Sequence, residues 1–408
     1  MQAERRCEQC GQMIPWGEQK CPACGGGDER FLWRVSRNEL LLLSVLVLII
    51  LFSITTFLVK TYRAKERELA QEWYVSGKRE LNAGHADVAL RDFRSALVYS
   101  RNDPLIELQL AHALSAAGHY HEARAYLLGL WESEPGNGTV NRELARLAAG
   151  SGSVAEAVQY YHDAIYGQWD TDTTDHRRQA RLELAEFLLK VGQKAEAQAE
   201  LIAFAADLPP DPALQTQVAT LLLKTGEYEH AAPLFRQALR LRPNSTPALE
   251  GAGEASFEMR NYADARRYLA RARRLGAVSP QSQSLLETAT LIQESDPLAP
   301  RLSGQERASR AVRAFTQSMQ RLNECAAARG VSLDNNQQQS DLQKVHALAS
   351  ALQPQVRERN LSHDPDLLLK ATDMAFEIEK VTERACGEPR GMDLALLLLS
   401  QVQEGGNE

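Results

Sequence analysis

A period of 34 residues runs through the middle of the chain and limits its fold more than any other feature. Glycines recur at this spacing at Gly84, Gly118 and Gly152, and again at Gly192 and Gly226. Such spacing predicts a helix, a tight turn at the glycine, and a second helix with small residues where its neighbours pack. An alanine follows each glycine by five positions: Ala89, Ala123, Ala157, Ala197 and Ala231.

These residues resemble the tetratricopeptide repeat family, which packs helix pairs of 34 residues into a right-handed superhelix. Aromatic residues after the turn and prolines that close repeats follow the same pattern: Tyr120, Tyr228, Tyr262, Pro135, Pro209 and Pro243. The resemblance covers about residues 70–279, as six repeats. It implies an all-α fold, a tetratricopeptide-like α-solenoid that binds protein or peptide partners.

Two departures from the period stand out. Arg260 replaces the glycine of the last repeat, and the step from Gly152 to Gly192 is 40 residues, so six residues are inserted. The insertion lies near residues 167–176, which contain three aspartates and a histidine whose spacing matches no metal site. We expect a solvated connector there, with Trp169 exposed.

The resemblance also implies a concave groove lined by the first helix of each pair. Its wall is basic at the N-terminal end and centre and acidic in the last repeat, a layout that would orient an extended peptide. The alternative is that these charges serve solubility alone. The groove residues that the family pattern indicates are Tyr74, Lys78, Asn82, His112, Arg142, Arg146, Lys190, Lys224, Glu250 and Glu254.

A run of twenty uncharged residues, Leu40 to Val59, precedes the repeats. At 1.5 Å per residue it would span about 30 Å of hydrocarbon, the thickness of a bilayer core. We therefore expect a single transmembrane helix over 40–59, with a linker at 31–39 and a juxtamembrane helix at 60–69. A cleaved signal peptide fits less well, because a cysteine motif comes before the apolar run. A buried core helix also fits less well, because the flanks lack an amphipathic pattern.

Two Cys-x-x-Cys-Gly motifs lie near the N-terminus and contain Cys7, Cys10, Cys21 and Cys24. Four thiolates complete a tetrahedral shell around Zn²⁺ and leave no open position, so the metal would be structural. Each following glycine suits a tight turn with positive φ. The motif resembles the short zinc-ribbon family over about residues 5–27, and we assign residues 1–30 to this domain. A redox pair or two disulfides are the alternatives.

The orientation of the predicted anchor depends on redox chemistry, because six basic residues precede it and six follow it up to residue 79. A reducing cytoplasm protects a four-cysteine site, which places the ribbon inside and the repeats on the opposite side. Cys325 and Cys386 would then lie in an oxidising compartment, where they could form a disulfide. Two free, partly buried cysteines are the alternative.

Residues 280–408 lose the 34-residue period but keep helical apolar stripes, so we expect a helical C-terminal domain that caps the solenoid. The chain shows no nucleophile elbow, P-loop, dinucleotide-binding glycine cluster or His-Glu-x-x-His motif, and we identify no catalytic residue or small-molecule substrate. Its net charge of -7 also argues against nucleic-acid binding.

Together these features predict a membrane-anchored scaffold or adaptor and not an enzyme. Some bacterial envelope-assembly proteins combine the same parts, although their cysteine knuckle lies at the C-terminus, and this analogy suggests a role in cell-envelope assembly. Two alternatives remain open. One is a regulatory or catalytic subunit with its site in residues 280–408, and the other is a transmembrane sensor that uses the ribbon as its cytoplasmic output.

Overall fold

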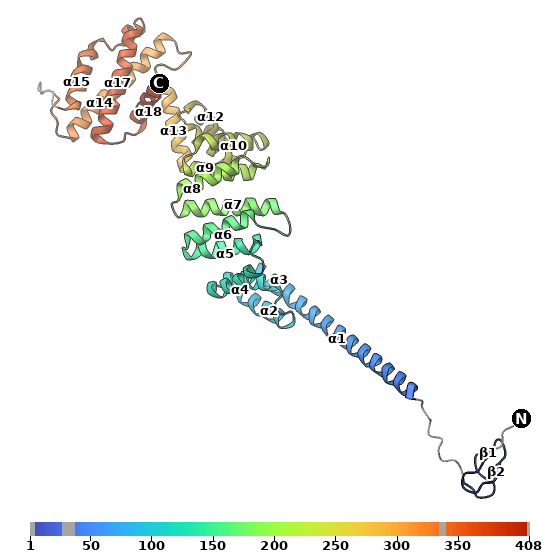
Figure 1. Cartoon of the computed structure of the whole chain (residues 1–408). Helices are drawn as coiled ribbons and strands as arrows, with labels where there is room; N and C mark the ends of the chain where they lie inside the picture. Colours follow the sequence, from blue (N-terminus) through green and yellow to red (C-terminus); the bar gives the residue numbers. More distant parts are fainter. Residues whose placement is uncertain (1–4, 27–36, 334–339, 406–408) are drawn as a thin grey trace. The chain divides into compact units, whose positions relative to one another are not determined.

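The computed structural model describes residues 5–26, 37–333 and 340–405 (Figure 1). Within them the chain is an all-α solenoid of paired helices that follows a small cysteine-containing hairpin. It divides into two compact units, Met1–Leu130 and Trp131–Glu408. We describe each unit by itself.

The hairpin at the start of the first unit consists of β1 (Arg5–Arg6) and β2 (Met13–Ile14). The strands are antiparallel, with Arg5 opposite Ile14 and Arg6 opposite Met13. Its buried residues are Cys7, Ile14 and Cys21, a core of one aliphatic side chain and two sulfurs. The outer parts of the predicted domain, 1–4 and 27–30, lie outside the described residues, as does most of the predicted linker.

A single unbroken helix, α1 (Arg37–Asn82), contains the predicted anchor, the predicted juxtamembrane helix and the first helix of the first repeat. Among the described residues it is the one helix long and apolar enough to cross a membrane, and none of its apolar window is buried. A signal sequence near the N-terminus would meet the same criteria. The apolar run and the first helix of the first repeat are thus parts of one continuous helix.

The last three turns of α1 pack against α2 (Ala86–Tyr99) to form the first repeat. Gly77 allows the close approach, because a Cβ atom there would lie 2.9 Å from the ring of Phe93. The second pair is α3 (Pro104–Ala116) and α4 (Tyr120–Ser133). The turn glycines Gly84 and Gly118 have φ values of 83° and 82°, as the repeat pattern requires.

Four more helix pairs build the repeats of the second unit, and their conserved spacing places the alanines in the core. Ala157, Ala197, Ala231 and Ala265 are all 0% exposed. Arg260, which replaces a turn glycine, still adopts a left-handed φ of 59°. The pairs are α5 (Gly138–Ser151) with α6 (Val154–Tyr166), α7 (Thr173–Lys190) with α8 (Lys194–Ala205), α9 (Pro212–Thr225) with α10 (Tyr228–Leu241), and α11 (Thr246–Glu258) with α12 (Tyr262–Leu275).

The insertion is largely exposed, as expected of a solvated connector, but Trp169 within it is partly buried. Its indole Nε1 donates a hydrogen bond of 3.0 Å to the carbonyl of Ala164, and its ring stacks on His176 at 4.7 Å. A Cβ atom on Gly138 would lie only 2.3 Å from the indole. The backbones of Gly138 and Gln168 also pair. The Trp169 side chain and the backbone of Gln168 thus contact the start of α5.

The C-terminal region is helical, as predicted, and covers the end of the last repeat. Helix α13 packs against both α12 and α18, and the guanidinium of Arg260 donates to the carbonyl of Gln401 at 2.7 Å. One apolar cluster joins Tyr262 of the last repeat to Phe376 and Leu396. The elements are α13 (Pro280–Ser295), α14 (Gly304–Ala328), α15 (Asp341–Leu352), a 3₁₀ turn η1 (Gln353–Gln355), α16 (Glu358–Leu361), α17 (Pro365–Cys386) and α18 (Gly391–Gly405).

Candidate functional site

The four N-terminal cysteines gather at one point, with their sulfur atoms all within 4.8 Å of one another. The Sγ atoms of Cys7 and Cys24 are 3.6 Å apart, and those of Cys10 and Cys21 are 3.5 Å apart. In a tetrahedral zinc site with Zn–S bonds of about 2.3 Å, neighbouring sulfurs lie about 3.8 Å apart. The cluster therefore has the donor set and the spacing of a site that can bind a metal ion.

The backbone forms a tight turn around each pair of cysteines. The amide of Gly11 donates to the carbonyl of Cys7, and the amide of Gly25 donates to that of Cys21, both at 2.8 Å. Both glycines have the positive φ expected for a metal knuckle. Backbone amides that face the sulfur, first that of Cys10, lower the pKa of Cys7 to about 6. A backbone amide at Gln12 lowers the pKa of Cys10, but hydrogen bonds with the thiols of Cys24, Cys21 and Cys7 outweigh it and raise that pKa to about 12. Metal ligation needs all four thiols deprotonated, so a bound metal would have to displace the proton of Cys10.

In the second unit, the two arginines assigned to the centre of the groove are already paired. Arg142 and Arg146 of α5 both contact Glu183 of α7, with N to O distances of 2.5 and 2.6 Å. Arg146 also contacts Glu143 at 2.7 Å. Burial raises the pKa of Glu183, but the two guanidinium groups outweigh it and leave the pKa below its usual value. The central wall is therefore a neutralised ion-pair network that joins two repeats.

Glu183 is the residue that sequence reasoning missed. It lies 41 residues after Arg142, so the pair depends on the six-residue insertion as well as on the repeat length. The available signal was a glutamate on the first helix of the fourth repeat, about one repeat after the two arginines. The ion pair shows that charges on neighbouring first helices must be counted together.

The acidic residues of the last repeat also bridge neighbouring first helices. Glu250 accepts a hydrogen bond of 2.6 Å from the hydroxyl of Ser282, and Glu254 accepts one of 3.0 Å from Gln281. Burial and the nearby carboxylate of Glu258 raise the pKa of Glu254. Lys190 and Lys224 are exposed at the ends of their helices. The wall of the last repeat, which contains Glu250 and Glu254, therefore keeps a net negative charge.

In the first unit, the assigned groove residues differ in exposure. Tyr74 is partly buried, with its ring centroid 6.1 Å from that of Phe93. Lys78 and Asn82 are exposed on α1, and His112 is partly buried on α3. Tyr74 therefore contributes to packing within the first repeat, whereas Lys78 and Asn82 present their polar groups to solvent.

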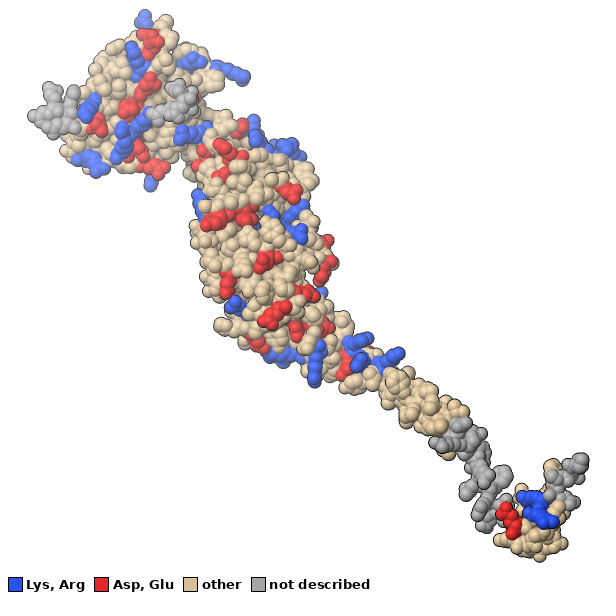
Figure 2. All heavy atoms as spheres, in the orientation of Figure 1, with Lys and Arg blue, Asp and Glu red and all other residues tan. Residues whose placement is uncertain are grey.

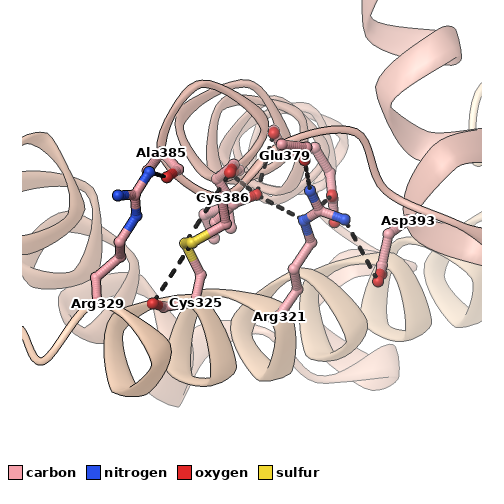
Figure 3. Close-up of a disulfide and its surroundings, with 10 residues drawn as sticks. Arg321, Cys325, Arg329, Glu379, Ala385, Cys386 and Asp393 are labelled. Carbon is pink, nitrogen blue, oxygen red and sulfur yellow. Dashed lines mark hydrogen bonds and ion pairs between the residues drawn. A yellow bond between two sulfur atoms is a disulfide. The ribbon is translucent and has the colours of Figure 1, made fainter.

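The C-terminal domain contains a disulfide between Cys325 of α14 and Cys386 of α17, with Cα atoms 5.9 Å apart (Figure 3). Polar contacts beside it join the same helices. The guanidinium of Arg329 donates to the carbonyl of Ala385, and that of Arg321 donates to the carbonyl of Gly387. The disulfide and these contacts hold the C-terminal ends of α14 and α17 together.

Next to the disulfide, one arginine forms ion pairs with two carboxylates. Arg321 lies 3.3 Å from Glu379, which is 0% exposed, and 3.9 Å from Asp393 of α18 (Figure 3). The hydroxyl of Ser318 donates to Glu379 at 2.7 Å. Burial, reinforced by the charge of Asp393, raises the pKa of Glu379 to about 7. This cluster therefore takes up a proton near neutral pH.

We expect Glu379→Gln to reduce the pH dependence of stability. Since the pKa of Glu379 is raised in the folded protein, the folded state binds more protons than the unfolded state between about pH 4.5 and 7, and stability falls as pH rises through this range. At pH 8 the variant should gain up to about 3 kcal/mol of stability over the wild type. Urea unfolding at pH 5 and pH 8 measures the difference.

The control for this experiment is Asp373→Asn, which changes an exposed carboxylate on the same helix. It should unfold with the pH dependence of the wild type. The Glu379 variant should still show a smaller dependence of its unfolding free energy on pH, because burial raises the pKa of Asp393 as well. An unchanged slope in Glu379→Gln would show that the buried carboxylate does not titrate in this range.

An open groove of about 620 Å³ lies along α15 and α17. Its apolar lining includes Leu348, Leu352 and Met374, and Lys370 and Glu377 lie at its polar side. The lining contains no histidine, cysteine or serine.

Comparison with known proteins identifies the repeats. One tetratricopeptide repeat model matches residues 108–173 and again residues 182–246. A second tetratricopeptide repeat model matches residues 222–288. These segments are tetratricopeptide repeats, as the 34-residue period predicted. No curated protein matches the chain.

Several solved structures are similar to part of this chain at low identity. PilW, a widely conserved type IV pilus biogenesis factor, is 18% identical, with a TM-score of 0.40, over 53% of this chain and 98% of its own. PilF of Pseudomonas aeruginosa is 18% identical, with a TM-score of 0.40, over 54% and 97%. YrrB, a repeat protein with an unusual peptide-binding site, is 18% identical, with a TM-score of 0.38, over 48% and 97%.

Proposed function

We propose that this protein is a membrane-anchored scaffold that binds protein or peptide partners through its repeats. The main support for the proposal is the continuity of α1, because this one helix contains both the twenty-residue apolar run and the first helix of the first repeat. A partner bound by the repeats is thereby held near the membrane. Tethering raises its effective concentration there, so that modest affinity is sufficient.

The proposal includes a structural zinc ion bound by the four ribbon cysteines, with the ribbon and the repeats on opposite sides of the membrane. The ribbon has four thiols that form no disulfide, whereas the only other two cysteines are joined in one. Free thiols persist in a reducing compartment and disulfides in an oxidising one. This contrast favours a cytoplasmic ribbon and repeats outside, where a role in cell-envelope assembly would lie.

A membrane-impermeant maleimide tests the topology on intact cells. We expect Cys325 and Cys386 to react only after treatment with a reductant, and the ribbon cysteines only after permeabilisation and metal chelation. Labelling of the ribbon in intact cells would reverse the orientation. Recovery of the protein in the soluble fraction after carbonate extraction would contradict the proposed membrane anchor.

Partner binding is tested in the groove of the second unit. Lys190→Glu with Lys224→Glu changes two exposed side chains of that wall. A partner recovered with the wild-type protein should be lost from this variant, because the reversed charges repel what the wall attracts. The matched control is Arg240→Glu, an exposed residue on α10, the second helix of its pair. Equal recovery with all three proteins would move the binding surface away from this groove.

A further inference from the structure

The register between α1 and α2 brings one turn of the first unit close to the point where α1 would leave the bilayer. Ser76 of α1 donates a hydrogen bond of 2.7 Å to Asp92 of α2, and the rings of Tyr74 and Phe93 lie 6.1 Å apart. The helices are therefore antiparallel. Continuing this register places Tyr99, the last residue of α2, level with residues 68–69 of α1.

The height of this turn above the hydrocarbon follows from helix geometry. Residues 68–69 come nine to ten residues after Val59, the end of the apolar run, which is about 14 Å at 1.5 Å per residue. The headgroup layer occupies about 5 to 8 Å of this distance. Packed helices lie about 8–10 Å apart, so a common tilt of about 20–30° toward α2 lowers the turn by about 4 Å. Side chains can span the remainder.

The side chains at this end have the character of a membrane interface. Tyr62, Val98 and Leu105 are 67%, 66% and 55% exposed, which is costly for apolar groups in water. Tyrosine is enriched at the headgroup level of membranes, and basic side chains near a membrane surface are attracted to anionic lipids. Arg101 is exposed at this end of the unit. Figure 2 shows the uncharged stretch of α1 and the charged side chains that follow it toward the repeats.

Tyr120 provides a comparison within the same unit. It is also largely exposed, at 61%, but it follows the far end of α3. Helix α3 is 13 residues long, or about 20 Å, and begins next to the turn described above. Exposure of an apolar side chain is therefore not by itself the argument. What distinguishes Tyr120 from Val98 and Leu105 is its position along the α1 axis, because it lies at the end of the unit farther from the apolar run.

We infer that the membrane-proximal patch, formed by Tyr62, Val98, Tyr99, Arg101 and Leu105, rests on the lipid headgroups of the bilayer that α1 crosses. The inference depends on the proposed anchoring by α1. With α1 alone, the first repeat could rotate about the helix axis. Contact at a second point, between α2 and α3, fixes which side of the first repeat faces the bilayer.

Photo-cross-linking of the full chain tests this contact. Benzoylphenylalanine replaces Val98, Leu105, Tyr120 or Phe57, one at a time, in protein reconstituted into vesicles of phosphatidylcholine and phosphatidylglycerol. We expect lipid adducts at Val98 and Leu105, none above background at Tyr120, and strong adducts at Phe57 within the apolar run. In pure phosphatidylcholine, the yield at Leu105 should fall if Arg101 contributes by charge.

The outcomes separate this inference from the proposed anchor. Lipid adducts at Phe57 without adducts at Val98 and Leu105 would overturn the patch and leave the anchor intact. Adducts to a second copy of the chain at Val98 would assign the patch to self-association and would also overturn the inference. Loss of lipid adducts at Phe57 would overturn the anchor, and the patch with it.

Discussion

A chain with Cys21→Ser is expected to lose the fold of residues 5–26 while its helical repeats keep theirs. Two strands of two residues and one buried isoleucine cannot offset the conformational entropy of the segment. Segments below about 40 residues usually need a metal or disulfides to fold. Bound zinc contributes about 10–16 kcal/mol in comparable peptides, and this binding free energy is also folding free energy.

Three measurements would show the loss. Metal analysis should find about one zinc per wild-type chain and much less in the variant, since three thiolates and a hydroxyl make a poor zinc site. Cobalt should give the visible bands of a tetrahedral thiolate complex only in the wild type. Limited proteolysis should cleave the variant between residues 5 and 26, with circular dichroism of the helices unchanged.

Glu8→Ala is the matched control, because Glu8 is exposed beside a ligand and donates no sulfur. It should bind zinc as the wild type does. A Cys21→Ser protein that kept a full zinc content and its resistance to protease would contradict the four-cysteine site. Chelation of the wild type should reproduce the effect of the variant and be reversed by added zinc.

The parts of the fold that could be predicted from sequence are those set by local spacing. A turn glycine, an alanine five residues later and a 34-residue period act within one helix pair, so the helices and their buried alanines follow from neighbouring positions. Even Arg260 keeps the left-handed turn, because the packing of its repeat holds the backbone there. The cysteine cluster was predictable for the same reason.

The features that were not predictable depend on pairs far apart in the chain. Trp169 was expected to be exposed because its segment is polar, but its indole fits against Gly138, which lies in the previous repeat. Arg142 and Arg146 were assigned to a basic wall, yet Glu183, 41 and 37 residues away, pairs with both and neutralises them together with Glu143. Residues 280–408 have no repeat to align, so the packing of α18 on α13 came from the structure alone.

The second large effect is expected from the disulfide. Cys325→Ser with Cys386→Ser should lower the stability of the C-terminal domain by about 4 kcal/mol, the loop-closure entropy for a crosslink 61 residues apart. The wild-type protein with reductant should approach the stability of the double variant, and the variant itself should not respond to reductant. Hydrogen exchange of α14 and α17 in the detergent-solubilised full chain gives the local stability.

Replacing both cysteines removes the crosslink without leaving an unpaired thiol, so the comparison isolates the bond from thiol chemistry. The folded domain should survive the change, because Arg321 and Arg329 still contact carbonyls beside Cys386 and the cluster around Phe315 and Ile378 stays buried. The loss should therefore appear as faster exchange at the ends of α14 and α17 and not as unfolding of the repeats. Equal exchange in the variant and the oxidised wild type would mean that these contacts alone hold the two helices and that the disulfide adds no local stability.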